Sequence, residues 1–246
     1  MALIHFNYLS TLAGAQTNVT IILPTSGMDD RRNGTVIEVP GMKYQVLWLL
    51  HGGGGDDSDF VNFSNIVRYA NEHKIAVVMP ASKGFFHEGK DFERVTEELP
   101  KLLRVLFPLS DKKEDNFICG LSHGGDCAMR ACFEYPDRYA AGLIMSAAGT
   151  EHRGELEKAA LLFDVYGCAE RNLIGKEGAP KLIFATGSGD RGFPYYVRVI
   201  DKLEEMGVAL TRYYVNNEGH SWDFWDNTVR LALHEMLPIR HDVIRP

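Results

Sequence analysis

The chain has 246 residues, of which 45% are hydrophobic and 24% are charged, and its net charge is −7. This length allows one domain with a large core. Lysine and arginine form no basic cluster, which argues against a nucleic-acid partner. No apolar run approaches the roughly 20 residues of a membrane span, and the first residues lack the pattern of a signal peptide. We therefore expect a cytoplasmic globular protein without a nucleic-acid or membrane partner.

The first third of the chain is dominated by predicted strands. A near-continuous apolar run, YQVLWLL at 44–50, is typical of a strand that is covered on both faces. The turn-rich segment 25–34 separates two of the other strands. The predicted strands are residues 5–10, 18–23, 36–39, 44–50 and 75–79, and a helix is predicted at 60–74.

The remainder alternates strands with helices. Predicted strands cover 116–119, 140–146, 181–186 and 210–215, and predicted helices cover 92–107, 125–135, 195–206 and 222–237. Pro100 is expected to kink or break the first of these helices. This alternation predicts an α/β fold, with a mostly parallel central sheet and helices on both faces. Residues 1–246 are expected to form a single domain, with a small lid at 148–180 that includes a short helix at 156–163.

The most informative motif is Gly120-Leu121-Ser122-His123-Gly124, which lies between a predicted strand and a predicted helix. A strand, the pattern G-x-S-x-G and a helix together form a nucleophile elbow, which raises the serine hydroxyl above the sheet on a strained turn. The alternative is a tight turn in which the serine only caps the helix. We take Ser122 as the candidate nucleophile.

A serine hydroxyl needs a positioned base, and the chain offers nine histidines. His220 is the best candidate because it follows the last predicted strand, and the carboxyl ends of parallel strands carry the chemistry of such sheets. A purely structural histidine is the alternative. His123 adjoins the nucleophile but is expected to point away from it, and His51 more simply braces the glycine loop after it. The sequence identifies no partner for the remaining candidates, His73, His87, His152 and His234.

Asp190 is the candidate carboxylate that would orient the base. It ends the segment Thr186-Gly187-Ser188-Gly189-Asp190, directly after a predicted strand. The chain order Ser122, Asp190, His220 is that of an α/β-hydrolase triad. Asp190 could instead cap a turn or helix, and Asp164 is the reserve candidate.

The glycine run 52–55 after the strand at 44–50 suggests an oxyanion hole. Backbone N–H groups in such a loop can approach the substrate closely. We assign one donor to Gly53 and the other to the backbone N–H of His123. A phosphate-binding loop is the alternative, but the P-loop Lys-Ser/Thr pair is missing, and nearby aspartates would repel an anion.

Aromatic residues near these loops are candidates for the acyl pocket, although each could equally pack in the core. They are Phe86, Tyr166, Phe193 and Trp222, with Phe85 and Phe163 as further candidates. The four cysteines lack metal-ligand spacing, and free thiols in a reducing compartment are the simplest interpretation. We therefore predict no metal and no cofactor.

Together these segments resemble the esterase D family, and most of all its bacterial tributyrin-esterase and acetyl-esterase branch. The resemblance rests on YQVLWLLHGGGGDDSDF, IAVVMP, DKKEDNFICGLSHGG and GVALTRYYVNNEGHSWDFWD. It implies metal-independent hydrolysis of short-chain carboxylic esters through Ser122, Asp190 and His220. Relatives often have methionine after the nucleophile, where this chain has His123. The resemblance also suggests a homo-oligomer, which the residues themselves leave open.

Three functions are compatible with these residues. The first is a carboxylesterase that acts on acetyl or butyryl esters, including acetylated sugars, through an acyl-enzyme on Ser122. The second uses the same site on another acyl bond, as an S-formylglutathione hydrolase-like thioesterase or a feruloyl or cinnamoyl esterase. The third is a non-catalytic binding module on the same scaffold, because a fold alone does not establish activity.

Overall fold

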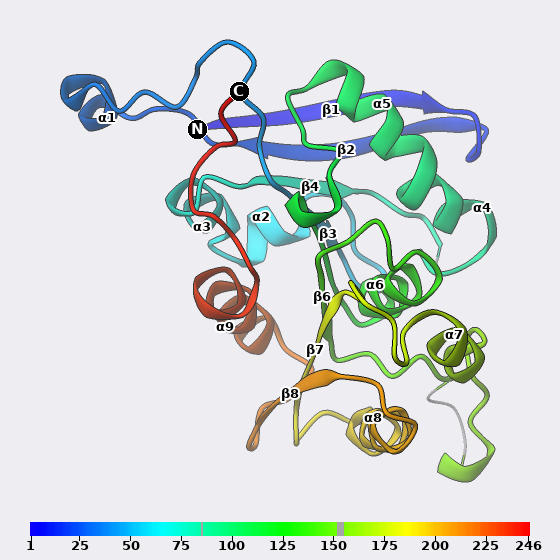
Figure 1. Ribbon diagram of the computed structural model, residues 1–246. Coiled ribbons are helices and arrows are strands. Elements are labelled where there is room, and N and C mark those ends of the chain that lie inside the picture. Colours follow the sequence, from blue (N-terminus) through cyan, green and yellow to red (C-terminus); the bar gives the residue numbers. More distant parts are fainter. Residues whose placement is uncertain (85, 152–154) are drawn as a thin grey trace.

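An eight-stranded sheet forms the centre of the protein in a computed structural model that describes residues 1–84, 86–151 and 155–246 (Figure 1). The strand order is β1-β2-β4-β3-β5-β6-β7-β8. β1 and β2 pair antiparallel with each other, β2 pairs antiparallel with β4, and every pair from β4 to β8 is parallel. The strands are β1 (Ala2–Ser10), β2 (Ala15–Leu23), β3 (Val46–Leu50), β4 (Ala76–Pro80), β5 (Asn116–Leu121), β6 (Ala141–Met145), β7 (Lys181–Gly187) and β8 (Leu210–Val215).

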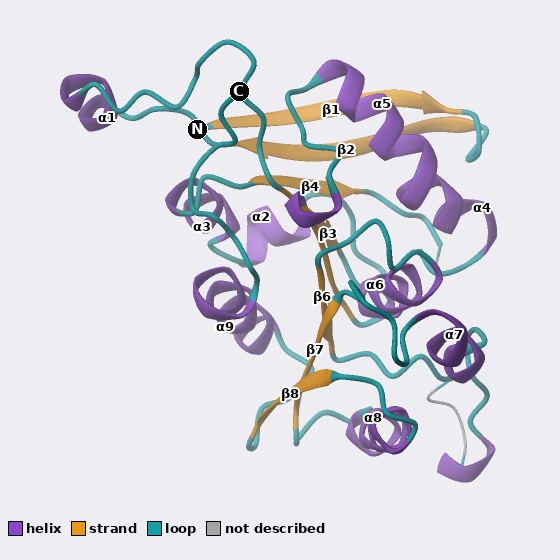
Figure 2. Cartoon of the chain, viewed as in Figure 1, coloured by secondary structure: helices purple, strands orange, loops and turns teal. Residues whose placement is uncertain are grey.

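Helices cover both faces of this sheet (Figure 2). Buried residues of α2, α3 and α9 pack on one face, and those of α5, α6, α7 and α8 pack on the other. The α-helices are α1 (Met28–Asn33), α2 (Asp59–Phe63), α3 (Ile66–Glu72), α4 (Gly89–Glu93), α5 (Leu99–Leu106), α6 (His123–Glu134), α7 (Val165–Asn172), α8 (Phe193–Glu205) and α9 (Trp222–Leu231). The predicted α/β-hydrolase architecture is therefore confirmed.

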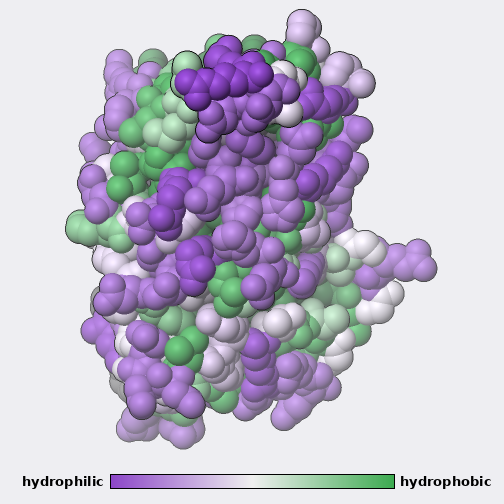
Figure 3. All heavy atoms as spheres, turned by 90° about the vertical axis from the view of Figure 1, so that its left-hand side faces the viewer, coloured by the Kyte–Doolittle hydropathy of each residue, from purple (hydrophilic) through white to green (hydrophobic). Residues whose placement is uncertain are grey.

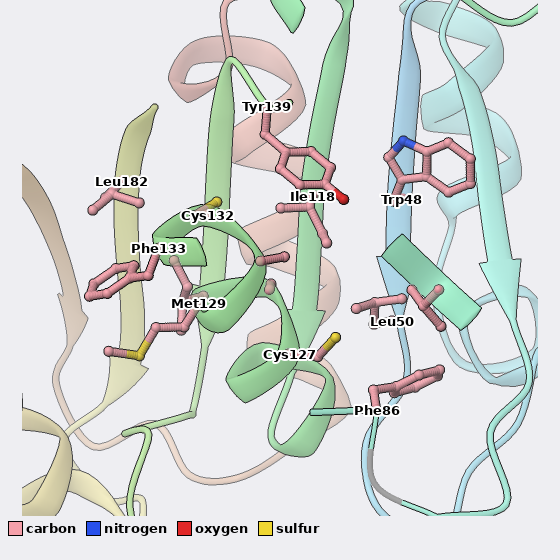
Figure 4. Packing of buried hydrophobic residues seen from close by; sticks show 14 of the residues in the cluster. Trp48, Leu50, Phe86, Ile118, Cys127, Met129, Cys132, Phe133, Tyr139 and Leu182 are labelled. Carbon is pink, nitrogen blue, oxygen red and sulfur yellow. The ribbon is translucent and has the colours of Figure 1, made fainter. Parts of the chain in front are cut away.

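The alternation of side chains along β3 explains why its sequence is apolar throughout. Trp48 and Leu50 face the core layer under α5 and α6, whereas Leu47 and Leu49 face the layer under α3 and α9. Figure 4 shows Trp48 and Leu50 among the side chains that fill the first layer, with Phe133 of α6 also in it. A strand buried on both faces has no solvated side, so a polar residue on it would be costly.

The predicted strand at 36–39 was wrong, because this segment bonds to a loop and not to the sheet. The hydroxyl of Ser26 accepts a hydrogen bond from the backbone N–H of Ile37 at 2.9 Å. The carboxylate of Glu38 in turn accepts from the backbone N–H of Ser26 at 2.8 Å. The turn-rich segment between them contains the short helix α1.

Three predicted helices are shorter or less regular than their apolar spacing suggested. The helix predicted at 60–74 is divided into α2 and α3, where the hydroxyl of Ser64 donates to the carbonyl of Phe60 at 2.5 Å. The helix predicted at 92–107 contains a π-helical segment, η1 (Arg94–Glu98), immediately before Pro100, whose ring nitrogen cannot donate a hydrogen bond. After α9 the chain likewise continues as a π-helical segment, η4 (Ala232–Met236).

The segment at 148–180 forms little regular structure above the sheet. Instead of a helix at 156–163, it contains a 3-10 turn, η3 (Leu156–Lys158), and a bridge between Thr150 and Leu161. The helix α7 then packs against α6, where the amide of Asn172 donates to the carbonyl of Phe133 at 2.8 Å. In the part of the chain that the structure describes, no helix has the length and apolarity that crossing a bilayer requires.

Candidate active site

Three loops at the carboxyl edge of the sheet bring the predicted catalytic residues to one cavity of about 500 Å³. Ser122 follows β5, Asp190 follows β7 and His220 follows β8, and all three line this cavity. Residues 30 to 98 positions apart in the chain meet here because parallel strands end at the same edge. The candidate site therefore lies at the edge of the sheet where the loops that follow the parallel strands come together.

Ser122 stands on a strained turn between β5 and α6. Its backbone angles are φ 52° and ψ −123°, outside the regions that serine normally adopts. The turn is held by the backbone N–H of Ser122, which donates to the carbonyl of Met145 at 2.8 Å. A Cβ atom on Gly124 would lie 2.3 Å from the carbonyl oxygen of Leu50, so only glycine permits this approach. The local sequence thus allows a strained serine that the surrounding strands hold in place.

Asp190 and His220 form a direct pair at the edge of the cavity. Nδ1 of His220 lies 2.7 Å from Oδ2 of Asp190, and Oδ1 of Asp190 accepts from the backbone N–H of Gly192 at 2.8 Å. Burial alone would raise the pKa of Asp190, but the hydrogen bonds from His220 and Gly192 outweigh it, and the pKa lies below its ordinary value. The carboxylate is therefore ionised at neutral pH and holds the proton of the imidazole on Nδ1.

A second serine, which the sequence did not single out, supports this pair. Ser146 follows β6 with φ 50°, and its hydroxyl also helps to lower the pKa of Asp190. The indole N–H of Trp225 donates to this hydroxyl at 3.1 Å, and the Trp225 ring packs edge-on against His220 with centroids 4.9 Å apart. The only sequence signal was the position of Ser146 at the end of a predicted strand, since a positive φ cannot be inferred for a serine.

The glycine loop after β3 is braced by His51, as predicted. Nδ1 of His51 donates to the carbonyl of Gly52 at 2.7 Å, and Nε2 accepts from the backbone N–H of Ser82 at 3.0 Å. Burial lowers the pKa of His51 more than the Gly52 contact raises it, so the ring is neutral at neutral pH. These two bonds fix both the ring and the loop.

The two segments proposed to supply oxyanion donors touch each other. A Cβ atom on Gly53 would lie 2.6 Å from Cδ2 of His123, and one on Gly52 would lie 3.5 Å from Cβ of Ser122. The glycine loop therefore closes over the residue that follows the nucleophile. Because a side chain on Gly53 would push the loop away, the close approach explains the glycine.

The side chain of His123 belongs to a polar cluster beside the nucleophile. Its ring stacks with that of His87, with centroids 5.8 Å apart, and its Nδ1 lies 3.8 Å from Oδ2 of Asp126. Burial raises the pKa of Asp126 to about 7, although the N–H groups of Gly149 and Ala148 partly oppose this shift. The three side chains offer ligand atoms within 4.8 Å of one another, so their donor set could also hold a metal ion. Motifs in the sequence identified no partner for His87 and did not single out Asp126.

The aromatic residues proposed for the acyl pocket are not among the residues that line the cavity. Phe86 is buried beside the ring of His51, with centroids 4.6 Å apart. Trp222 packs on Phe60 of α2, and Phe193 packs on Tyr214 of β8. Two further candidates, Tyr166 and Phe163, pack against the core, and Phe85 lies outside the described residues. Their aromatic character alone could not distinguish core from pocket.

Most of the residues that do line the cavity have polar side chains. Leu162 contributes apolar surface, and most of the other lining residues carry charged or hydroxyl groups. Besides the residues already described, the polar ones are Glu88, Thr150, Glu151 and Arg191. The reserve carboxylate Asp164 is not among the lining residues, and it caps α7 by accepting from the N–H of Gly167 at 3.1 Å.

The sheet order, the strained serine after β5 and the histidine–aspartate pair define a serine hydrolase of the α/β-hydrolase fold. The sequence model of the family described as "Putative esterase" matches residues 14–152, and the chain belongs to that family. Over 96% of this chain and 98% of the relative, it is 26% identical to an acetyl esterase from Caldicellulosiruptor saccharolyticus. The protein is a serine esterase.

Two solved structures from Staphylococcus aureus are similar over most of the chain. One is the fluorophosphonate-binding serine hydrolase FphF, with a TM-score of 0.82 and 25% identity over 96% of this chain and 98% of that one. The other is the S-formylglutathione hydrolase FrmB, with a TM-score of 0.74 and 26% identity over the same shares. A ferulic acid esterase at 16% identity, with a TM-score of 0.75, covers 96% of this chain and 97% of its own and shares the fold.

Proposed function

We propose that this esterase hydrolyses short-chain acyl esters through a covalent acyl-enzyme on Ser122, with His220 as general base and Asp190 as its orienting carboxylate. The observation that carries the proposal is the 2.7 Å contact between His220 and Asp190, which line the same cavity as the strained Ser122. The alternative of a serine that only caps a helix does not explain why this pair lines the same cavity.

In the proposed first half-reaction, Oγ of Ser122 attacks the carbonyl carbon of the ester, while Nε2 of His220 takes the hydroxyl proton. The imidazolium that forms is stabilised by the ionised carboxylate of Asp190. The C–O bond to the alcohol then breaks, the alcohol leaves with the proton from His220, and the acyl group remains on Ser122. The strained backbone of Ser122 supports this role because it exposes the side chain at the start of α6.

Oxyanion stabilisation is proposed to come from the backbone N–H groups of Gly53 and His123. The close packing of Gly53 on the His123 ring supports this pairing, since it keeps both segments next to the nucleophile. In the second half-reaction, His220 takes a proton from water as the water oxygen attacks the acyl carbon. The acid product leaves when the C–O bond to Ser122 breaks, and the proton returns to Oγ.

The substrate that we propose has a short acyl group, acetyl or butyryl, on a hydrophilic alcohol such as a sugar. Glu88, Glu151 and Arg191 line the cavity, and their side chains can form hydrogen bonds with the hydroxyl groups of such an alcohol. The similarity to an acetyl esterase supports the same acyl group. The segment at 148–180 would act as a small lid, because Thr150, Glu151 and Leu162 belong to it and line the cavity.

A panel of p-nitrophenyl esters from acetate to decanoate, followed by acetylated sugars, tests this proposal. We expect the highest kcat/KM for acetate or butyrate, and a loss of at least about a thousandfold in the Ser122→Ala variant. Ser58→Ala is the matched control, because Ser58 lies in the loop before α2 and does not line the cavity. Equal activity of Ser122→Ala and wild type would refute the assignment of the nucleophile.

A thioester substrate of the S-formylglutathione type is the second candidate, supported by the 26% identity to a protein with that activity. Feruloyl esters are a third possibility, which the similarity to feruloyl esterases supports at the level of the fold. Comparing kcat/KM for S-formylglutathione, methyl ferulate and an acetate ester ranks them directly. A preference for the thioester of more than about tenfold would favour the second candidate.

A cytoplasmic location and a homo-oligomeric state are also proposed. All four cysteines are free and buried, which suits a reducing compartment. Fractionation of cells that express the protein tests the location, and light scattering on the purified chain tests the oligomeric state.

A further inference from the structure

A second group of titratable side chains lies at the opposite edge of the sheet from the cavity. Glu72 ends α3 and His73 follows it, shortly before the amino end of β4. His234 comes from η4, and His241 comes from the C-terminal segment that runs past α3 (Figure 1). The esterase reaction uses none of these residues, and the fold brings together positions that are more than 160 residues apart in sequence.

The imidazole rings of this group are in direct contact. The rings of His73 and His234 meet edge-on with centroids 4.4 Å apart, and Nδ1 of His73 lies 2.8 Å from Nδ1 of His241. Glu72, His73 and His234 each offer one ligand atom, and these atoms lie within 4.8 Å of one another. Two imidazoles and a carboxylate thus converge from the end of α3 and from η4.

His73 is the buried member, and one of its nitrogens has no partner in the structure. The residue is 5% exposed, and its Nε2 atom is buried without a hydrogen bond. An unsatisfied buried polar atom costs roughly 1–3 kcal/mol. Burial is the main cause that lowers the pKa of His73, and repulsion from the neighbouring His234 and His241 lowers it further, to about 4. The ring is therefore neutral and can act as a ligand at neutral pH.

The contact between His73 and His241 occupies Nδ1 of His73, so Nε2 is the nitrogen that remains for a metal ion. Only one of the two facing Nδ1 atoms can carry the shared proton. If His73 carries it, His73 donates to His241, and the lone pair of its Nε2 is free. Metal-bound histidines show this arrangement, in which the second ring nitrogen donates to an outer partner. His241 has a left-handed backbone with φ 57°, so holding it against His73 costs conformational free energy.

We propose that Glu72, His73 and His234 form a binding site for a divalent transition-metal ion, with Zn²⁺ as the best match, and that His241 positions His73. Two imidazole nitrogens and one carboxylate oxygen suit Zn²⁺, whereas Ca²⁺ and Mg²⁺ prefer oxygen ligands alone. Water would complete a tetrahedral shell. This site adds a metal to a protein for which the sequence predicted none, and it takes no part in ester hydrolysis.

The side chains that must move to close the site are free to do so. Glu72 and His234 are exposed, and Glu72 otherwise makes a contact of 3.6 Å with exposed Arg68, which is a weak competitor. The ligand atoms lie within 4.8 Å of one another, and they must move closer together for each to lie about 2.0–2.2 Å from a central ion. The bound ion would join α3 to η4, and it would stabilise the folded chain by mass action.

Metal binding to the tag-free, chelator-treated protein tests this site with a readout independent of activity. Co²⁺ and Zn²⁺ stoichiometry is measured by equilibrium dialysis, and the melting temperature is measured with and without Zn²⁺. The variants are His73→Gln and His234→Gln, with His241→Asn for the positioning role. His5→Gln is the matched control because His5 lies on β1 and contacts Thr20.

We expect each ligand variant to bind one equivalent less than wild type and to lose the rise in melting temperature due to this site. His241→Asn should keep the stoichiometry but bind about 10–100-fold more weakly, and His5→Gln should match wild type. Counting the loss of one equivalent separates this site from the cluster of His87, His123 and Asp126. The proposal is wrong if wild type binds no metal, or if both ligand variants bind as much metal as wild type does.

Discussion

The indole N–H of Trp225 donates to the hydroxyl of Ser146 at 3.1 Å, and this contact lies directly behind the proposed base. The same hydroxyl helps to lower the pKa of Asp190, and the Trp225 ring packs against His220. The pair of Asp190 and His220 thus contacts a residue that directly follows β6 and a residue of α9, the helix that begins two residues after His220. Ser146 itself lines the cavity, and we propose that it acts on the reaction as a positioning residue through Asp190.

Replacing Ser146 tests this positioning role. We expect Ser146→Ala to lower kcat by roughly tenfold with little change in KM, because the carboxylate loses a hydrogen bond of about 1.4 kcal/mol. The variant should also raise the pKa of Asp190, which NMR titration of its carboxyl carbon measures. Ser146→Cys, which keeps a weaker S–H donor and adds no branch at Cβ to a residue with φ 50°, is the conservative comparison. A loss of kcat equal in both variants would point to a packing effect.

Gly53→Ala tests the proposed oxyanion loop. The new Cβ atom would lie 2.6 Å from Cδ2 of His123, so the loop and the His123 ring must move apart, which changes the relative position of the two proposed donor segments. We expect kcat/KM for p-nitrophenyl acetate to fall about 100-fold, while the melting temperature changes little. Gly27→Ala is the control, because its Cβ would meet its nearest neighbour at an ordinary 3.5 Å. An active Gly53→Ala variant would exclude this loop as an oxyanion donor.

The pair of Asp190 and His220 also contributes to stability in a defined pH range. The folded state lowers the pKa of Asp190 below its ordinary value of 3.8, so the pair stabilises the fold above that pH. This contribution is lost as the pH falls from 3.8 through the lower pKa of the folded state. In urea unfolding, wild type should therefore have a higher free energy of unfolding than Asp190→Asn at about pH 6. This difference should shrink toward about pH 3. A difference that stays constant across this range would contradict the ionised pair.

Asp126 should have the opposite effect, because burial raises its pKa to about 7. A carboxyl with a raised pKa is stabilised as the neutral acid, so the fold loses stability as the pH rises from 3.8 through about 7. Asp126→Asn keeps an oxygen that can accept from the N–H of Gly149 and removes this cost. We expect its melting temperature to exceed that of wild type by about 2 °C or more at pH 8, with a smaller gain at pH 5. Scanning calorimetry at both pH values checks this.

Patterns of apolar residues predicted most of the sheet and its flanking helices, because strands buried on both faces leave a continuous apolar signal, as in β3. The irregular elements were less predictable. The π-helical segment before Pro100 and the division between α2 and α3 depend on single side chains that compete with backbone hydrogen bonds. The segment at 36–39 had strand-like composition but found its partner in Ser26.

The candidate site likewise combines residues that sequence motifs predict with residues that only the fold reveals. Ser122, Asp190 and His220 lie in motifs at strand ends, so their order in the chain already pointed to one edge of the sheet. Ser146 and Asp126 carry no motif, and only the packing of β6 and α6 brings them to the site. Of the aromatic candidates, Phe86 is buried beside His51, and half-buried Trp222 packs on Phe60. Hydrophobic character in the sequence does not distinguish such packing from a pocket.

The identity of the nucleophile is tested most directly by covalent labelling with a fluorophosphonate probe. Intact mass and peptide mapping would measure the number and position of the adducts on wild type, Ser122→Ala and the control Ser58→Ala. We predict one adduct, on Ser122, in wild type and in Ser58→Ala, together with complete loss of esterase activity, and no adduct on Ser122→Ala. Labelling of another residue, or unchanged activity after complete labelling of Ser122, would contradict the proposed mechanism.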